Sequence, residues 1–277
     1  MTTAVLVSES CRPIVRILGV PVDATDLPRA VESIKRWGER GKARAVFLRD
    51  VHGVMRSVQM HALMQMHETA DLVLADGAPL TWISRLRGVK VGRVPGTDLI
   101  DAVCRASAGT GLKHYFFGGA PDVPARMAEA LKAKYPGLKV AGYYSPPMRN
   151  LAPGATLSDE ERAEIANIAA TGADFIWVGL STPKQETWIT RATQLLPHGV
   201  CFGVGAAFDF HTGRVKRAPR WMQRNGLEWF HRLLSDPRRL WRRYIILAPK
   251  FVLLSAAEEL SRVLTRGTAE NSSNMAR

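Results

Sequence analysis

The chain has 277 residues, 46% of them hydrophobic and 23% charged, which is enough to bury the core of one large or two small domains. Lysine and arginine number 38 against 25 acidic residues, a net charge of +13 that favours a polyanionic partner: nucleic acid, a phospholipid surface or a diphosphate. Three widely spaced cysteines without C-x-x-C spacing argue against a zinc site or a disulfide framework and predict a reduced, cytoplasmic protein. We expect no signal peptide, and no apolar stretch reaches the ~20 residues of a membrane span, so membrane contact is expected to be peripheral.

Short apolar runs alternate with amphipathic stretches along the first three quarters of the chain. This alternation predicts an α/β fold, with a mainly parallel, Rossmann-like sheet flanked by helices. The runs typical of buried strands are residues 15–20, 45–48, 72–74, 114–117, 139–143, 175–178 and 200–204. The helix-like segments are residues 27–37, 51–67, 97–108, 123–134, 158–170 and 183–195.

Two helix starts can be read from side-chain chemistry. Ser158 and Glu161 form the S-x-x-E pattern of a capping box. Thr182 places a capping hydroxyl before Pro183, which is expected at the first helical position. The loops at residues 118–121 and 179–183 should therefore lie at the carboxyl ends of strands, where open α/β sheets bind ligands.

The composition changes after about residue 212. Residues 214–250 carry eleven cations against two acids, mixed with tryptophan, tyrosine and phenylalanine. Arginine and aromatic side chains suit a phospholipid headgroup layer, and we prefer this to the alternatives of nucleic acid or packing on the core. We expect an α/β core at 14–212, a basic amphipathic helical appendage at 213–266, and flexible tails at 1–13 and 267–277.

An aspartate on a glycine turn follows one predicted strand. Asp76 comes directly after residues 72–74 and precedes Gly77. A carboxylate at a strand end is well placed to act as a general base on a sugar hydroxyl. A turn or helix-cap aspartate is the alternative, and local pattern alone favours it.

Two further turns are suited to a nucleotide. The segment from Gly179 through Lys184, Gln185 and Glu186 offers backbone amides and a cation to phosphate, although a capped surface helix has the same pattern. The Gly-Gly turn at residues 118–119 permits close backbone approach but is weak by itself. A dinucleotide site at residues 203–208 is improbable, because Phe208 replaces the third glycine of the fingerprint.

No metal or cofactor is expected. His52, His61 and His67 are spaced nine and six residues apart, which does not stack them as ligands on one helix, and the chain has no Asp-x-Asp motif. Arginines would then have to neutralise the diphosphate of a nucleotide donor.

Taken in order, six segments resemble the WecG/TagA/CpsF glycosyltransferase family (glycosyltransferase family 26). The resemblance covers roughly residues 15–257. The segments are residues 70–77 (ADLVLADG), 92–98 (GRVPGTD), 115–119 (YFFGG), 178–186 (VGLSTPKQE), 203–209 (GVGAAFD), and 213–244 with its R-A-P-x-W, G-L-E-W and P-x-R elements.

This resemblance implies an inverting, metal-independent transfer from a UDP-sugar to an undecaprenyl-diphosphate-linked saccharide, on an anionic membrane surface at the inner face of the cytoplasmic membrane. It also implies possible homo-oligomers and no nucleic acid partner. By resemblance, Asp76 is the base and Arg93 contacts the departing diphosphate. The implied nucleotide-sugar contacts are Asp50, Gly77, Gly118, Gly119, Gly179, Lys184, Gln185 and Glu186. The implied acceptor, diphosphate or membrane contacts are Arg217, Arg232, Arg239 and Arg243.

One departure from the family pattern concerns the sugar. Members often carry T-x-N after the second strand, where this chain has Leu48, Arg49 and Asp50. The donor is therefore left open between N-acetylmannosamine-type sugars, glucose and glucuronate. Two other classes also stay open: a basic nucleic-acid-binding protein, and a catalytically inactive adaptor of a polysaccharide assembly complex.

Overall fold

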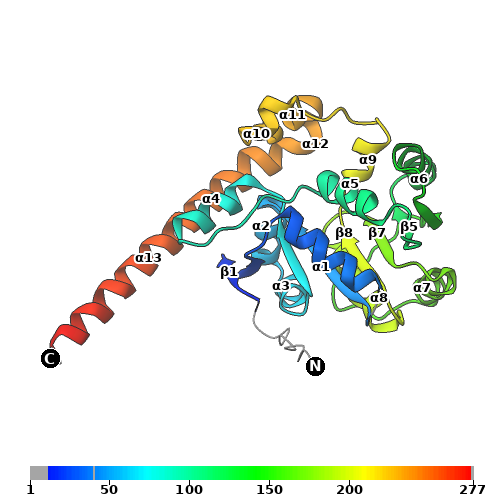
Figure 1. The fold of residues 1–277 in the computed structure, drawn as a ribbon. Helices are drawn as coiled ribbons and strands as arrows, with labels where there is room; N and C mark the ends of the chain where they lie inside the picture. The colour runs from blue at the N-terminus through cyan, green and yellow to red at the C-terminus, as the bar shows by residue number, and fades with distance from the viewer. Residues whose placement is uncertain (1–11, 40, 276–277) are drawn as a thin grey trace, which may run out of the picture.

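A six-stranded parallel sheet forms the centre of the molecule (Figure 1). The computed structural model describes residues 12–39 and 41–275, without the side chains of Arg224, Arg239 and residues 266–275. The strand order is β4-β3-β8-β7-β5-β6, and every neighbouring pair is parallel. The strands are β3 (Arg44–Arg49), β4 (Leu72–Ala75), β5 (Lys113–Gly118), β6 (Lys139–Tyr144), β7 (Phe175–Gly179) and β8 (Val200–Gly203).

Helices cover both faces of the sheet. Alternate residues of a strand point to opposite faces, so Val46 belongs to the apolar cluster that contains residues of α1, α5 and α6, whereas Phe47 belongs to the cluster that contains residues of α7 and α8 and packs against α3. The α/β fold predicted from the alternating pattern is confirmed. The helices of this part are α1 (Leu27–Glu39), α2 (Val51–Gln59), α3 (His61–Glu68), α4 (Ala78–Leu86), α5 (Gly96–Ser107), α6 (Val123–Lys134), α7 (Asp159–Thr171) and α8 (Lys184–Leu195).

Two predicted elements are divided in the structure. Residues 15–20 are not a strand of the main sheet but parts of an antiparallel hairpin, β1 (Ile14–Ile17) and β2 (Val20–Asp23). Leu18 and Gly19 turn the chain with φ of 48° and 85°. The single helix expected at 51–67 is α2 and α3, because Met60 between them has an extended backbone.

The helix starts differ in their caps. The predicted capping box of Ser158 and Glu161 is present at α7. The predicted Thr182 cap is wrong: α8 begins at Lys184, and the Thr182 hydroxyl donates to the Glu186 carboxylate at 3.1 Å. The carboxylate accepts the hydroxyl proton and so fixes the orientation of the Thr182 side chain.

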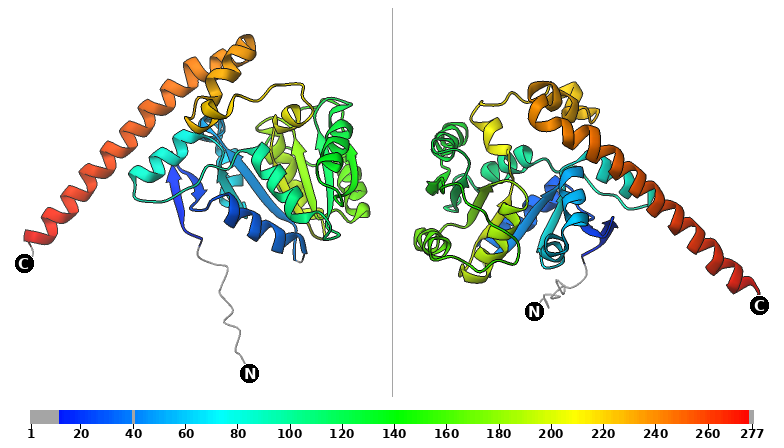
Figure 2. Two further views of the ribbon diagram at one scale, coloured as in Figure 1. Left: turned by 45° about the horizontal axis from the view of Figure 1, so that its top comes forward. Right: turned by 180° about the vertical axis from the view of Figure 1, so that it is seen from behind.

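The C-terminal appendage is helical and lies against one end of the core (Figures 1 and 2). It follows α9 (Ala207–His211) and consists of α10 (Arg220–Arg224), α11 (Glu228–Ser235), α12 (Pro237–Trp241), the π-helical turn η1 (Arg242–Leu247) and α13 (Ala248–Met275). Phe251 anchors α13 in an apolar cluster with the hairpin, α2 and α4.

The far part of α13 projects away from the body (Figure 2). It continues to Met275, beyond the expected boundary at residue 266, while most of the expected tail at 1–13, and residues 276–277, lie outside the described residues. Within the described chain no helix combines the length and apolar character that crossing a membrane requires.

Candidate active site

Asp76 lies at the carboxyl end of β4, beside the end of β3. Its backbone N–H donates to the Arg49 carbonyl oxygen at 2.8 Å, and that of Gly77 donates to the same oxygen at 3.3 Å. A Cβ on Gly77 would lie 3.2 Å from the Asp50 Cα, a tight contact, so glycine favours the close approach of the two loops. The structure thus brings Asp50, Asp76 and Gly77 together at one edge of the sheet.

Arg93 connects this edge to the appendage. Its Nε donates to the Asp76 carbonyl oxygen at 2.8 Å, its Nη1 to the Gln223 carbonyl oxygen at 3.1 Å, and its Nη2 to Glu228 at 2.6 Å. A guanidinium with several fixed bonds is a preorganised positive charge. Arg93 therefore lies beside Asp76, and its predicted contact with a departing diphosphate stays a prediction.

Asp76 as a whole residue is half-buried, and neither of its carboxylate oxygens is among the fully buried atoms that lack a partner. Burial raises its pKa above the ordinary value, against the opposing positive charges of Arg93 and then Arg232. In the described part of the chain no group donates a hydrogen bond to this carboxylate. A desolvated carboxylate with a free acceptor position is suited to take a proton from a hydroxyl.

Gln185 and Glu186 lie inward of this edge, in a buried polar cluster. Glu186 is fully buried and forms an ion pair with the fully buried Arg49, and it also accepts hydrogen bonds from Gln185 Nε2 at 2.8 Å and from Thr182. Burial raises the pKa of Glu186, but Arg49 and Gln185 outweigh this and hold it below the ordinary value. The P-K-Q-E loop is thus linked to Asp76 through Arg49.

Part of this cluster has no partner among the described residues. Gln185 Oε1, Glu186 Oε2, and Nε and Nη1 of Arg49 are buried without a hydrogen bond. Buried polar atoms are normally satisfied, so these atoms mark the place where water or a ligand group would bind. The Gln185 side chain also lies close to Gly203 and Gly205.

The glycines of the two other predicted loops pack on each other. Gly119 N–H donates to the Gly179 carbonyl oxygen at 3.1 Å, joining the ends of β5 and β7. Gly118 has φ of 109°, and a Cβ on Gly179 would lie 2.7 Å from the ring of Phe208. Lys184 is half-buried at the start of α8. These residues lie, like Asp76, at the carboxyl ends of the parallel strands. They end or follow β5 and β7, however, which are several strands away from β4.

The appendage arginines have different surroundings. Arg243 forms an ion pair with Asp50, and Arg217 pairs with Asp98 at 2.5 Å. Arg232 lies over the Phe210 ring, 5.3 Å from its centroid, and acts electrostatically on Asp76. The side chain of Arg239 lies outside the described residues. Among the appendage residues, Arg232 thus supplies a leading positive charge at the proposed base.

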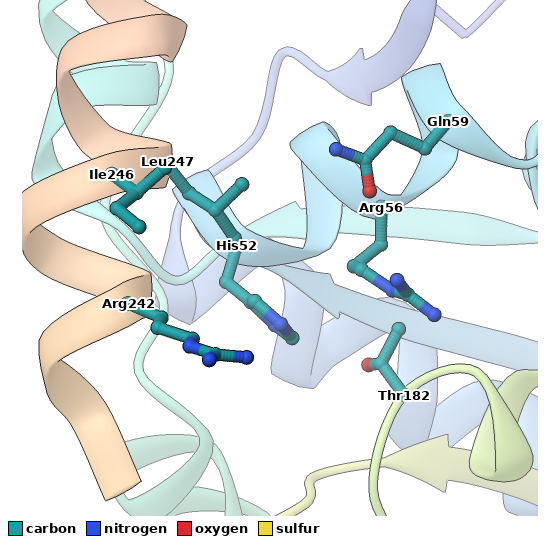
Figure 3. A pocket seen from close by; sticks show the side chains of 7 residues that line it. All are labelled: His52, Arg56, Gln59, Thr182, Arg242, Ile246 and Leu247. Carbon is teal, nitrogen blue, oxygen red and sulfur yellow. The ribbon is translucent and has the colours of Figure 1, made fainter. Parts of the chain in front are cut away.

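A cavity of about 370 Å³ lies between the core and the appendage (Figure 3). Its polar side chains, including those of His52, Arg56, Thr182 and Arg242, point into a common space, whereas Ile246 and Leu247 supply an apolar wall. Burial, followed by the charges of Arg56 and Arg49, lowers the pKa of His52, so the cations of the cavity are its two arginines. Such a lining suits an anion that carries an apolar or sugar portion.

Comparison with known proteins identifies the family. The model of the "Glycosyl transferase WecG/TagA/CpsF family" matches residues 15–264. The chain belongs to this family. An N-acetylglucosaminyldiphosphoundecaprenol N-acetyl-beta-D-mannosaminyltransferase of Bacillus spizizenii is 35% identical over 185 residues, which is 66% of this chain and 67% of the relative. A protein of the same name from Bacillus subtilis is 31% identical over 199 residues, 70% of this chain and 72% of the relative.

Membership of the WecG/TagA/CpsF family makes the chain a glycosyltransferase and confirms the resemblance drawn from its motifs. Within the described residues no group of three or more histidines, cysteines or acids is placed to hold a metal ion. Sequence reasoning did not include Arg49, His52, Arg56 or Arg242 in the site. The one available signal for Arg49 was a charge directly after the apolar run 45–48, whereas the cavity residues carry no local signal.

Proposed function

We propose that this chain is an inverting glycosyltransferase that moves a sugar from a UDP-sugar to an undecaprenyl-diphosphate-linked saccharide in cell-surface polysaccharide biosynthesis. The observation that carries the proposal is the Asp76 carboxylate, which is desolvated, free of hydrogen bonds from the described residues and flanked by Arg93. The printed names of the two Bacillus relatives support a lipid-linked acceptor.

Asp76 acts as the general base in this proposal. Its carboxylate takes the proton of the acceptor hydroxyl while that oxygen attacks the anomeric carbon of the donor. The new C–O bond forms opposite the bond that breaks, so the configuration inverts and UDP leaves with the bonding electron pair. Its raised pKa makes Asp76 a stronger base than an exposed aspartate, while the charges of Arg93 and Arg232 oppose the rise.

Arginines stabilise the charge that grows on the departing diphosphate. Arg93 is held by Glu228 and by two carbonyl oxygens, and Arg56 and Arg242 project into the cavity. Fixed cations in a partly desolvated site stabilise a developing charge without reorganisation. The buried Gln185, with its unpartnered Oε1, is positioned to bind a donor hydroxyl or amide.

The donor is proposed to be an N-acetylmannosamine-type sugar, glucose or glucuronate. The names of the relatives favour the first. The Asp50 carboxylate already accepts the Gly53 N–H at 2.9 Å and pairs with Arg243, so its contact with a sugar would use its remaining acceptor positions. Peripheral binding to the inner face of the cytoplasmic membrane, through the appendage, would bring the base to the lipid-linked acceptor.

The proposal is tested by incubating the full chain with each UDP-sugar and undecaprenyl-diphosphate-linked N-acetylglucosamine or a membrane lipid extract. Mass spectrometry should show one glycosyl increment on the lipid, and NMR should show inversion at the anomeric carbon. An inactive adaptor would bind vesicles and give no increment with any donor. Salt-sensitive binding to nucleic acid without transfer would instead support the nucleic-acid alternative.

A further inference from the structure

The segment that follows Asp76 is rich in cations and has no acids. Residues 77–97 contain Arg85, Arg87, Lys90 and Arg93 and neither aspartate nor glutamate. Arg87 pairs with two glutamates of α13, and Arg93 is held at the active site. Arg85 and Lys90 are exposed and form no ion pair with any residue that the structure describes. Two cations therefore remain available to an external anion.

These two cations lie on one cavity. It has a volume of about 380 Å³ and is lined by Thr81, Arg85, Gly88, Val89, Lys90 and Val91. No acid is among the lining residues, and the valines supply an apolar portion. The cavity is complementary in charge to a phosphate group that is attached to an apolar body.

Large apolar side chains flank this cavity on the outside of α4. Trp82 is 57% exposed and Leu86 is 73% exposed, and the two are four residues apart on one side of the helix. Tryptophan and leucine beside cations are typical of a helix that lies in the headgroup layer of a membrane. Exposure of both side chains to water alone is unfavourable, which favours an occupant for this face.

The appendage lies beside α4. Arg87 joins the end of α4 to Glu258 and Glu259 of α13, and the two helices lie at the same end of the molecule in the different views (Figures 1 and 2). The opposite side of α13 is apolar and exposed. Its large exposed residues are Val252, Leu253, Leu260, Val263 and Leu264.

We infer that α4 and the loop after it form an anionic-phospholipid docking site on the catalytic core, separate from the appendage arginines. Arg85 and Lys90 bind a lipid phosphate in the cavity, while Trp82 and Leu86 enter the apolar boundary. By contrast, Arg217 and Arg243 are already paired with acids. This inference goes beyond the proposed transfer, because it assigns a lipid site to a part of the core that touches no substrate.

The docking site would set the position of the base above the lipid. Asp76 immediately precedes α4, and Leu86 is the last residue of that helix. At a rise of about 1.5 Å per residue, the ten positions between them span about 15 Å. A helix held in the headgroup layer by its C-terminal half would therefore keep Asp76 within reach of a diphosphate-linked sugar at the same surface.

Flotation with vesicles of phosphatidylglycerol and phosphatidylcholine tests the inference on the full chain. Arg85→Glu/Lys90→Glu should reduce vesicle affinity by at least about 30-fold, since each cation near an anionic surface contributes about a factor of five. The matched control, Arg105→Glu/Lys139→Glu, makes the same charge change at exposed positions of α5 and β6. An equal loss in both double variants, or no loss in the first, overturns the inference.

A second variant removes apolar surface without changing charge. Leu86→Ser should lower affinity for the same vesicles about tenfold, whereas Leu195→Ser, at an exposed position of α8, should not. Both Leu86→Ser and the α4 double variant should keep their turnover on a short-chain, water-soluble acceptor. Loss of vesicle binding with turnover retained supports the inference, and binding unchanged in Leu86→Ser contradicts it. Failure of the wild type to transfer any sugar would instead count against the proposed function alone.

Discussion

Arg243 of η1 forms an ion pair with Asp50, the residue that caps α2 at the end of β3. The two residues are 193 positions apart, and the pair fastens the appendage to the loop beside Asp76. Arg93 makes a second connection, to Gln223 and Glu228. The candidate site is therefore complete only while the appendage is docked on the sheet edge.

Asp50→Asn separates the two roles of Asp50. Asparagine caps a helix as well as aspartate does, so α2 should be retained, but the ion pair with Arg243 is lost. Because both side chains are about three-quarters buried, global stability should fall by about 1–3 kcal/mol. Hydrogen exchange should be faster at residues 242–247 and unchanged at residues 51–59. Unchanged exchange at 242–247 would show that this pair does not fasten the appendage.

Arg93→Gln should shift the pH dependence of transfer. Burial raises the pKa of Asp76, and Arg93 is the largest opposing charge, so its removal should raise this pKa further. The base must be ionised, and the acid limb of kcat against pH should therefore move to higher pH. Arg105→Gln, at an exposed position of α5, is the control and should leave the limb in place. If the acid limb does not move in Arg93→Gln, the group that titrates in this limb is not Asp76.

Removing one partner of the buried pair of Arg49 and Glu186 should destabilise the fold more than removing both partners. Glu186→Leu leaves a buried guanidinium without its anion and should cost about 3–5 kcal/mol of unfolding free energy. Arg49→Leu/Glu186→Leu should cost less, since no charge stays buried. Glu129→Leu breaks the exposed pair with Lys132 and should cost about 1 kcal/mol or less. Urea unfolding measures all three, and a double variant less stable than Glu186→Leu would contradict this account.

Two buried histidines should make the fold sensitive to acid. Burial lowers the pKa of His67 to about 4 and that of His114 to about 3, from an ordinary 6.5. As the pH falls, these histidines therefore bind protons in the unfolded chain before they do so in the folded chain. Their contribution to the unfolding free energy is complete above pH 6.5 and is lost as the pH falls toward 4 and 3. Each histidine contributes a slope of up to about 1.4 kcal/mol per pH unit.

His114→Gln tests whether His114 contributes to this loss of stability at low pH. Glutamine can still accept the Trp177 indole N–H, which His114 accepts at 3.0 Å, but it does not titrate. Unfolding free energies at pH 6.5, 5.5 and 4.5 should decline less steeply in this variant. An unchanged slope would mean that His114 does not contribute to the acid sensitivity.

Sequence patterns correctly predicted most strands of the main sheet, because these strands are short apolar runs, as in Phe175–Gly179. They failed where a turn was hidden in an apolar run, as at Leu18, or where amphipathic character continued across a break, as at Met60. The position of Asp76 at a strand end was also readable. The partners of Arg49 and Asp50 could not be predicted in this way. Each partner lies more than a hundred residues away, and the contact depends on how the layers of the fold pack.

The most direct test of the central claim is the turnover of Asp76→Asn, measured with a UDP-sugar and a lipid-linked acceptor on anionic vesicles. Asparagine preserves the shape of the side chain but cannot take a proton, so turnover should fall by ~10²–10⁴ while vesicle binding and folding stay unchanged. Asp98→Asn, which alters the nearby pair with Arg217, should lose far less. A loss of only a few-fold in Asp76→Asn would contradict the assignment of Asp76 as the base.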